Sequence, residues 1–352
     1  MTIKILFALF LLLACAAWLY CSPSKRESLP EKPIDQVWWD ALSEEWKTIL
    51  RINQYFYRNR VDFYQIQQEY LNRMNGPEDA NHTALNTSLR DLNEKQKFLL
   101  SYNDMYARVR KKFPSDSADT IDLGSLHLID KIYMVSGPGD LTPLKKFAKL
   151  KVLVANYCGI NHSVPHDEQV LNLEPLRKLS QLEHLHCVSP ALKSLEPLKD
   201  LTNLTYLDCE NSDVTTLAPL KNLHRLERLF FGSKVENASV IARLTNLKTL
   251  HIAGCKEIPD LSTLQKLQEL CLIENELALV NSRYRISELG FLKNLSALEF
   301  LDFDLTSYRG NLADLNKLTR LKAVTLPRVP TSDMQAFKQA HPGCVVINEY
   351  EW

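Results

Sequence analysis

Three histidines and one aspartate are spaced so that they could meet on one surface of a sheet. His184 and His186 are two residues apart, so a strand would place both side chains on the same face. Asp208 and His251 follow at spacings that fit later strands of a repeating chain. Imidazole and carboxylate groups in one cluster suit a zinc ion, although histidines on a polar sheet surface are more often solvated. We therefore keep a metal-dependent enzyme as an alternative function and assign no metal site.

The eight cysteines show none of the paired close spacings that mark a zinc site or a small disulfide scaffold. Cys187 and Cys209 occupy equivalent inward positions in neighbouring units of the repeat described below. A disulfide between adjacent strands of a regular parallel sheet has poor geometry, so we expect two small buried side chains. Cys271 lies on the outward side of its strand and is not assigned a role.

Other signs of catalysis or of nucleic-acid binding are missing from the sequence. It contains no glycine-rich phosphate loop, no HExxH and no GxSxG, and its ten glycines leave few turns able to cradle a cofactor. Forty-two basic residues balance forty-two acidic ones, so no overall field attracts nucleic acid. We predict a protein that is not an enzyme and that uses no cofactor.

The strongest pattern is an apolar repeat of the form LxxLxxLxxLxL. Its period is about 22 residues, with insertions of about ten residues at 159–169 and 277–288, which is typical of a solenoid. One position of the repeat recurs along two thirds of the chain, at Ile132, Leu153, Leu185, Leu207, Leu229, Leu250, Leu270, Leu301 and Val324.

Each unit predicts one short strand in which alternate side chains point inward. Several return segments open with proline followed by leucine, as in Pro143-Leu144 and Pro197-Leu198. Proline fits the first position of a helical turn, and the few residues available favour short or 3₁₀ turns on the convex side. The expected fold is α/β, a solenoid with a curved parallel sheet, preceded by a small α-helical region.

Residues 121 to 348 resemble leucine-rich repeat proteins of the 22-residue type, such as bacterial internalins and a regulatory subunit of protein phosphatase 1. The resemblance implies a recognition scaffold and leaves the ligand open. One departure concerns the position that is usually asparagine, which is occupied here by Cys158, Pro190, Ser212, Lys234, Cys255, Asn275, Thr306 and Val329. A regular asparagine ladder is therefore not expected.

The outward strand positions form two rows across neighbouring repeats. Large rigid side chains on such a face give contact area at low entropy cost, and aromatic side chains beside one another are costly to expose without a partner. We therefore predict a protein-binding site on the concave face, with no nucleic acid and no metal, formed by Tyr133, His184, His186, Tyr206, Asp208, Arg228, Phe230, His251, Glu269, Phe300 and Asp302.

The N-terminus carries an apolar run from Ile5 to Cys21, preceded by Lys4. The run is slightly short for a transmembrane helix, and it indicates export. Three fates remain open: lipidation of Cys15, cleavage at an AxA site, or an uncleaved anchor followed by Lys25 and Arg26. We expect an exported protein, membrane-tethered, periplasmic or at the cell surface, that touches the membrane only through this segment.

Four segments follow from these patterns. Residues 1–21 are the signal or anchor, and residues 22–36 are a proline-containing linker. Residues 37–114 are expected to form a helical N-terminal cap, in which Ser43 caps a helix and a second apolar stripe runs from Phe98 to Phe113. Residues 115–348 hold the repeats and a closing strand. The predicted function is a non-enzymatic binding module outside the cytoplasm, with a structural envelope protein as a further alternative.

Overall fold

The computed structural model describes residues 34–58, 60, 121–135, 137–156, 158–160, 165, 168–232, 235–253, 259–273, 292–304, 312–326 and 331–348. The chain divides into one unit ending at Ile129 and a second unit from Asp130 to Trp352. In the described part, no helix combines the length and apolar character needed to span a membrane. The apolar run at 5–21 and the stripe at 98–113 lie outside the described residues.

The first unit contains helices α2 (Gln36–Asp40) and α3 (Glu44–Arg58). The Asp35 carboxylate accepts from the backbone N–H of Trp38 at 2.8 Å. The Ser43 hydroxyl accepts from the backbone N–H of Trp46 at 3.2 Å, which confirms the predicted cap of α3. Both bonds satisfy N–H groups that the first turn of a helix leaves without an intrahelical partner.

Helix α3 is amphipathic, and its buried face includes Ile49 and Leu50, which are fully buried. Its Gln54 side chain accepts from the backbone N–H of Asp122 at 2.9 Å and donates to the carbonyl of Asp122 at 2.7 Å. Asp122 in turn caps the short helix α7 (Leu123–Leu126). These bonds join two segments of the unit that are far apart in sequence and give a buried amide both of its partners.

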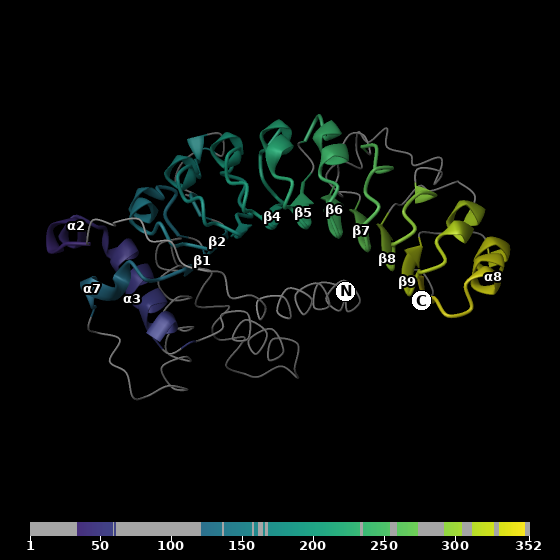
Figure 1. The fold of residues 1–352 in the computed structure, drawn as a ribbon, viewed down its shortest axis with the longest axis horizontal. Coiled ribbons are helices and arrows are strands. Elements are labelled where there is room, and N and C mark those ends of the chain that lie inside the picture. Colours follow the sequence, from purple (N-terminus) through teal and green to yellow (C-terminus); the bar gives the residue numbers. More distant parts are fainter. Residues whose placement is uncertain are drawn as a thin grey trace. The chain divides into compact units, whose positions relative to one another are not determined.

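The second unit is a parallel sheet of ten strands in sequence order, which lines the inner side of the arc in Figure 1. Every neighbouring pair is parallel, and the partners in β3, β4 and β5 are residues in equivalent positions of successive repeats. The strands are β1 (Lys131–Val135), β2 (Val152–Asn156), β3 (His184–His186), β4 (Tyr206–Cys209), β5 (Arg228–Phe231), β6 (Thr249–Ala253), β7 (Glu269–Ile273), β8 (Phe300–Asp304), β9 (Ala323–Leu326) and β10 (Val345–Asn348).

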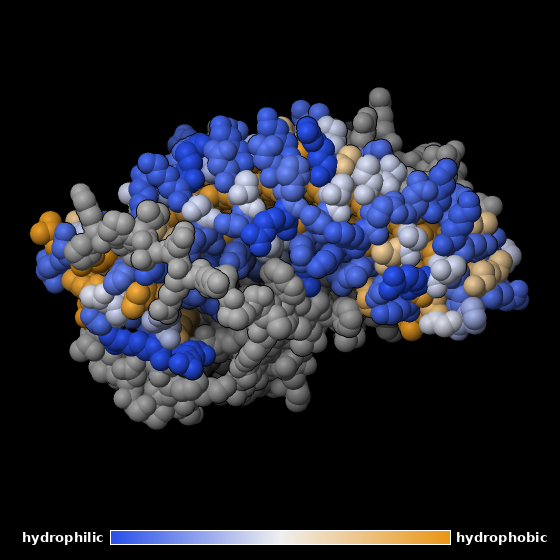
Figure 2. All heavy atoms as spheres, in the orientation of Figure 1, coloured by the Kyte–Doolittle hydropathy of each residue, from blue (hydrophilic) through white to orange (hydrophobic). Residues whose placement is uncertain are grey.

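The return segments form 3₁₀ turns on the outer side of the same arc, as the proline positions predict (Figure 1). Hydrophilic residues predominate over these turns in Figure 2. The turns are η1 (Thr142–Lys146), η3 (Glu174–Leu176), η4 (Glu196–Leu198), η5 (Ala218–Asn222), η6 (Ser239–Arg243) and η9 (Leu312–Lys317).

Most of these returns open with a short polar side chain that accepts from the backbone N–H two residues further along the chain. The Asn172 side chain, for example, accepts from the backbone N–H of Glu174 at 2.9 Å. Asp, Asn, Ser and Thr side chains favour this local bond because they are short enough to reach their own backbone. The same bond recurs at Asp140, Ser194, Thr216, Asn237 and Asp260.

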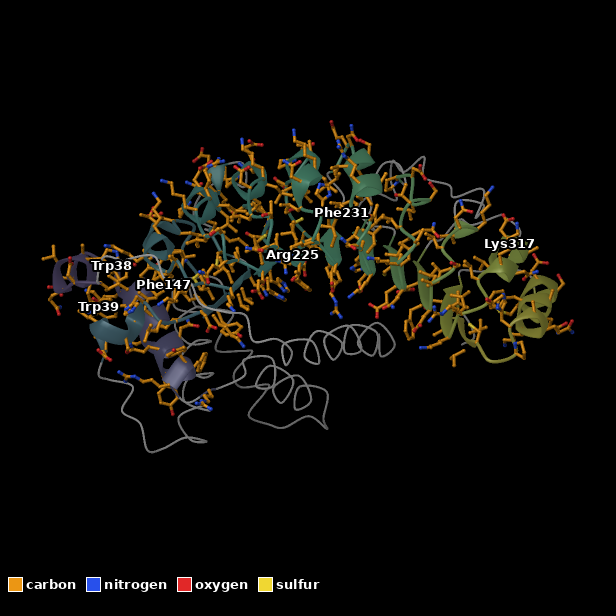
Figure 3. The ribbon with its side chains drawn as sticks, in the orientation of Figure 1. Trp38, Trp39, Phe147, Arg225, Phe231 and Lys317 are labelled. Carbon is orange, nitrogen blue, oxygen red and sulfur yellow. The ribbon has the colours of Figure 1, made fainter. Side chains whose placement is uncertain are left out.

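The core lies between the sheet and the turns, where repeat leucines such as Leu207 and Leu229 are fully buried. Phe231 fills this layer in Figure 3 and has no exposed surface. Cys187 and Cys209 are buried free thiols, as predicted, and each donates to a backbone carbonyl of the next strand. Burial raises the pKa of both thiols well above the ordinary value.

Neighbouring repeats are also joined by a polar row that the sequence pattern did not predict. The Asn203 amide donates to the carbonyl of Ser180 at 2.8 Å and accepts from the Arg225 guanidinium at 2.6 Å (Figure 3). Asn246 donates to the carbonyl of His224 and accepts from Lys266, both at 2.7 Å. Asparagine and a cation thus alternate from repeat to repeat, at a position other than the usual asparagine ladder.

The C-terminal end of the unit contains α8 (Thr331–Ala340) followed by β10. Phe337 is almost fully buried and stacks on His341 with ring centroids 4.5 Å apart. The predicted closing strand is therefore present, and it pairs with β9. Val345 of this last strand is 61% exposed.

Candidate functional site

Aromatic rings of four neighbouring strands contact one another across the concave face. His184 of β3 stacks on Tyr206 of β4, with ring centroids 3.9 Å apart and planes inclined by 8°. Tyr206 contacts Phe230 of β5 at 5.4 Å, and Phe230 meets His251 of β6 edge-on at 5.7 Å. We call these four residues the ring ladder. His184 with Tyr206 and Phe230 with His251 are register partners, which parallel strands hold about 4.8 Å apart, whereas Tyr206 and Phe230 meet diagonally across neighbouring strands.

The ring ladder is less exposed than the sequence suggested. Tyr206 is 8% exposed and Phe230 is 6% exposed, although both lie at outward strand positions. Stacking removes part of the surface of each ring from water. By contrast, Arg228, Glu269, Phe300 and Asp302 keep intermediate exposure. Tyr133, which was grouped with them, is almost fully buried at 2%.

Two histidine–carboxylate pairs lie at the ring ladder, one of them formed by its last member, His251. His186 Nε2 lies 3.3 Å from Asp208 Oδ2, in the adjacent strand. His251 Nδ1 contacts the Glu210 carboxylate, and these two side chains are 12% and 21% exposed. Glu210 reaches across the intervening repeat, where the equivalent position is Gly232 and carries no side chain. The four residues His186, Asp208, Glu210 and His251 are called the imidazole–carboxylate cluster below.

Burial and neighbouring charge shift the pKa values of this cluster. Burial raises the pKa of Asp208, and the adjacent Glu210 charge adds to that shift while His186 opposes it. Burial on its own would lower the pKa of His251, but the hydrogen bond and charge of Glu210, aided by Asp208 and Asp302, raise it above the ordinary value. The protonated forms of His251 and Asp208 are therefore favoured relative to the same groups in water.

His184 behaves in the opposite way. Burial lowers its pKa well below the ordinary histidine value, and the positive charges of His186, Arg228 and Lys131 lower it further. Its ring therefore remains neutral at physiological pH and serves as a stacking partner for Tyr206.

The C-terminal half of the concave face combines carboxylates with a ring and a lysine. Glu269 accepts from the Thr249 hydroxyl at 2.9 Å, and the Cys271 thiol donates to Asp302 at 3.4 Å. The ammonium of Lys322 lies 5.9 Å from the Phe300 ring centroid, within range of a cation–π interaction. Lys322 also pairs with Glu299 at 2.5 Å.

The structure brings some of the predicted residues into contact and adds others beside them. The structure brings together His184, Tyr206, Phe230 and His251, and pairs His186 with Asp208. Glu210, Glu299 and Lys322 were not predicted, because they lie just outside the two strand positions considered. The alternation that selected Asp208 also points to Glu210, two residues further along the chain.

The metal-site alternative gains no support from this geometry. Each of His186 and His251 contacts its own carboxylate, and no group of three or more potential ligands in the described part of the chain is arranged to hold a metal ion. Cys271 lies directly beside His251 in the register, a neighbour that the sequence interpretation overlooked. Its thiol donates to the Asp302 carboxylate, which disfavours the nucleophilic thiolate.

The repeated strand, the in-register parallel sheet and the 3₁₀ returns make this chain a leucine-rich repeat protein with a solenoid fold. Neither the protein-family models nor the curated proteins contain a match to the sequence.

Comparison with solved structures gives matches at low identity. An internalin of Listeria monocytogenes matches with 17% identity and a TM-score of 0.37, over 68% of this chain and 88% of its own. Internalin C2 of the same organism matches with 15% identity and a TM-score of 0.40, over 68% and 90%. A leucine-rich repeat protein of Leptospira interrogans shares 16% identity at a TM-score of 0.38, over 64% and 68%.

Proposed function

We propose that this protein is a non-enzymatic module that binds a protein partner through the concave face of its repeats. The observation that carries the proposal is the ring ladder, a set of aromatic side chains fixed by mutual stacking at the centre of that face. Aromatic residues held in one conformation lose little entropy on binding, so they suit the centre of an interface.

The residues at the margin of the ladder would supply the contacts with the partner. Arg228, Glu269 and Phe300 are partly exposed at outward positions of three strands, whereas Tyr206 and Phe230 are buried among their neighbours. The ladder would then act as a rigid floor, and the marginal residues as the groups that distinguish one partner from another. This division of roles modifies the simple expectation of exposed aromatic anchors.

Affinity capture with the full chain, from the membrane fraction of its native cells, tests the proposal. Phe300→Ala should weaken capture of a protein retained by the wild type, because truncating a hot-spot residue costs on the order of 2 kcal/mol. The matched controls, Lys199→Ala and Lys221→Ala, change the convex returns and should capture as the wild type does. Loss of capture in the control variants alone would contradict a concave binding face.

We further propose that the module works outside the cytoplasm, tethered through its N-terminus. The support is the apolar run from Ile5 to Cys21, preceded by Lys4 and followed by a proline-containing linker. Full-length chain should appear in the membrane or exported fraction, and chain lacking residues 1–22 should remain in the cytoplasm. Cys15→Ser should abolish labelling by a lipid precursor if that cysteine is lipidated. Full-length protein found in the cytoplasm with Met1 intact would refute the proposal.

A further inference from the structure

Carboxylates outnumber permanent cations at the centre of the concave face. From β4 to β8, the described outward side chains include one permanent cation, Arg228, and four acids. The acids are Asp208, Glu210, Glu269 and Asp302. His251 lies among them on β6, and the charge of an imidazole depends on pH. Near neutral pH the centre of the face is therefore net negative, although the chain as a whole carries no net charge.

The rings on this face add a second preference for positive charge. The negative face of an aromatic ring attracts lysine and arginine, and a nearby carboxylate strengthens the attraction. Lys322 illustrates the arrangement within the chain, since it lies over Phe300 and pairs with Glu299. Glu269, which is the register partner of Phe300 in β7, places another carboxylate beside the same ring.

We propose that the partner presents a lysine- or arginine-containing segment to the centre of the concave face, between β4 and β8. The inference rests on the proposed function, since it specifies the chemistry of the partner that this face binds. Its basis is charge complementarity. An acidic segment would be repelled by four carboxylates and attracted by a single arginine. An entirely apolar segment would desolvate those charges without supplying a counter-ion.

The imidazole–carboxylate cluster makes this recognition dependent on pH. When His251 is protonated, it neutralises Glu210 from within the face and repels an incoming cation. Asp302 adds negative charge near His251, and Arg228 adds positive charge near His184. His184 adds no charge because its pKa is lowered. A basic segment should therefore bind more weakly in mildly acidic solution, and an acidic one more strongly.

Two labelled peptides test the inference on the full chain, one of alternating lysine and alanine and one of alternating glutamate and alanine. Fluorescence anisotropy should show that at about pH 7.5 the lysine peptide binds more tightly than the glutamate peptide. The affinity of the lysine peptide should be several-fold lower at about pH 5.5. The double variant Glu269→Gln/Asp302→Asn should lower its affinity by about tenfold. Both glutamate and aspartate are partly exposed, and their amides keep the shape and an acceptor oxygen.

Glu196→Gln on the convex return is the matched control, because it removes one carboxylate of an exposed pair with Lys199. The control should bind the lysine peptide as the wild type does. Equal loss in the control and the double variant would reveal diffuse attraction and overturn the inference. So would preferential binding of the glutamate peptide, or lysine-peptide affinity that is unchanged in the double variant.

Failure of the inference and failure of the proposed function give different results. If Phe300→Ala abolishes capture of the native partner while the lysine peptide does not bind, the concave face is the binding site and its charge preference is wrong. If Phe300→Ala captures normally and the lysine peptide still binds selectively, a cation site exists without the proposed protein-binding role.

Discussion

Replacing Glu210 by glutamine should change the way in which the stability of the repeats depends on pH. The Glu210 carboxylate contacts His251 Nδ1, and it is the main group that raises the pKa of this histidine against the effect of burial. Glutamine keeps the size and an acceptor oxygen but carries no charge. In Glu210→Gln, burial should dominate and the pKa of His251 should fall.

The sign of the effect follows from proton linkage. A histidine whose pKa is raised in the folded state contributes stability that is fully present below its unfolded pKa and is lost as pH rises through the folded value. The wild type should therefore gain stability from this pair in mildly acidic solution and lose it as the solution becomes alkaline. Asp208, whose pKa is raised by burial, acts in the same direction at lower pH. His184 and His341 oppose both, because their lowered pKa values make folding less favourable as pH falls.

The magnitude follows from the burial of the pair. Hydrogen bonds to a charged group contribute about 1.5–3 kcal/mol when little exposed, and these side chains are only 12% and 21% exposed. We therefore expect Glu210→Gln to lower the free energy of unfolding by about 1.5–3 kcal/mol in mildly acidic solution. The loss should shrink at alkaline pH, where His251 is neutral in the wild type as well.

Urea unfolding at several pH values, with NMR titration of the His251 ring, measures both quantities on the full chain. The difference between variant and wild type cancels the contributions of His184 and His341, which the substitution does not touch. Glu196→Gln, in an exposed pair with Lys199, should cost little stability and should not alter the His251 titration. A His251 pKa that stays raised in Glu210→Gln, or an identical loss at all pH values, would refute the reasoning.

Three further predictions concern the scaffold. Phe231→Ala should destabilise the repeats by about 3–5 kcal/mol in urea unfolding, because the ring is fully buried, whereas Phe300→Ala should cost under about 1.5 kcal/mol; similar losses would contradict the assignment of core and face. Asn203→Ala should cost about 0.5–1.5 kcal/mol by the same measurement, through two lost bonds between repeats, and no change would show that the polar row is incidental. Cys187 and Cys209 should resist alkylation in the folded chain and react after unfolding, as peptide mass spectrometry would show; rapid reaction in the folded state would contradict their burial and raised pKa.

The fold of the repeats was predictable because one physical requirement recurs in every unit. Each leucine of the pattern has to be buried between sheet and turns, so a period of about 22 residues determines strand positions, inward positions and return segments together. Proline before leucine then indicated the 3₁₀ returns. The register of neighbouring strands follows as well, since Leu185, Leu207 and Leu229 are both pattern positions and register partners.

The chemistry of the concave face was less predictable, because no repeated requirement determines it. Side chains at outward positions do not have to match between units, so their conformations depend on individual neighbours. The pattern located Tyr206 and Phe230 but overestimated their exposure, which depends on stacking with His184 and His251. The polar row at Asn203 was missed for a related reason: it alternates between asparagine and a cation, so no single residue type recurs.

The position of Gly232 shows how one repeat can shape the chemistry of its neighbours. Glu210 belongs to the repeat of β4 and His251 to that of β6, so their contact spans the repeat of β5. A Cβ at Gly232 would lie 3.2 Å from the backbone nitrogen of Asn211 and 3.8 Å from the backbone of Glu210. We therefore expect the contact to depend on a small residue in a repeat that contributes nothing to it directly. In a solenoid, the specificity of a face can thus depend on residues that leave space as well as on those that fill it.

It follows that Gly232→Val should lower the pKa of His251 much as Glu210→Gln does, while Gly343→Ala, where a Cβ has open space, should leave it unchanged. NMR titration of the His251 ring would decide the matter, and an unchanged titration in folded Gly232→Val would mean that the contact does not need that space.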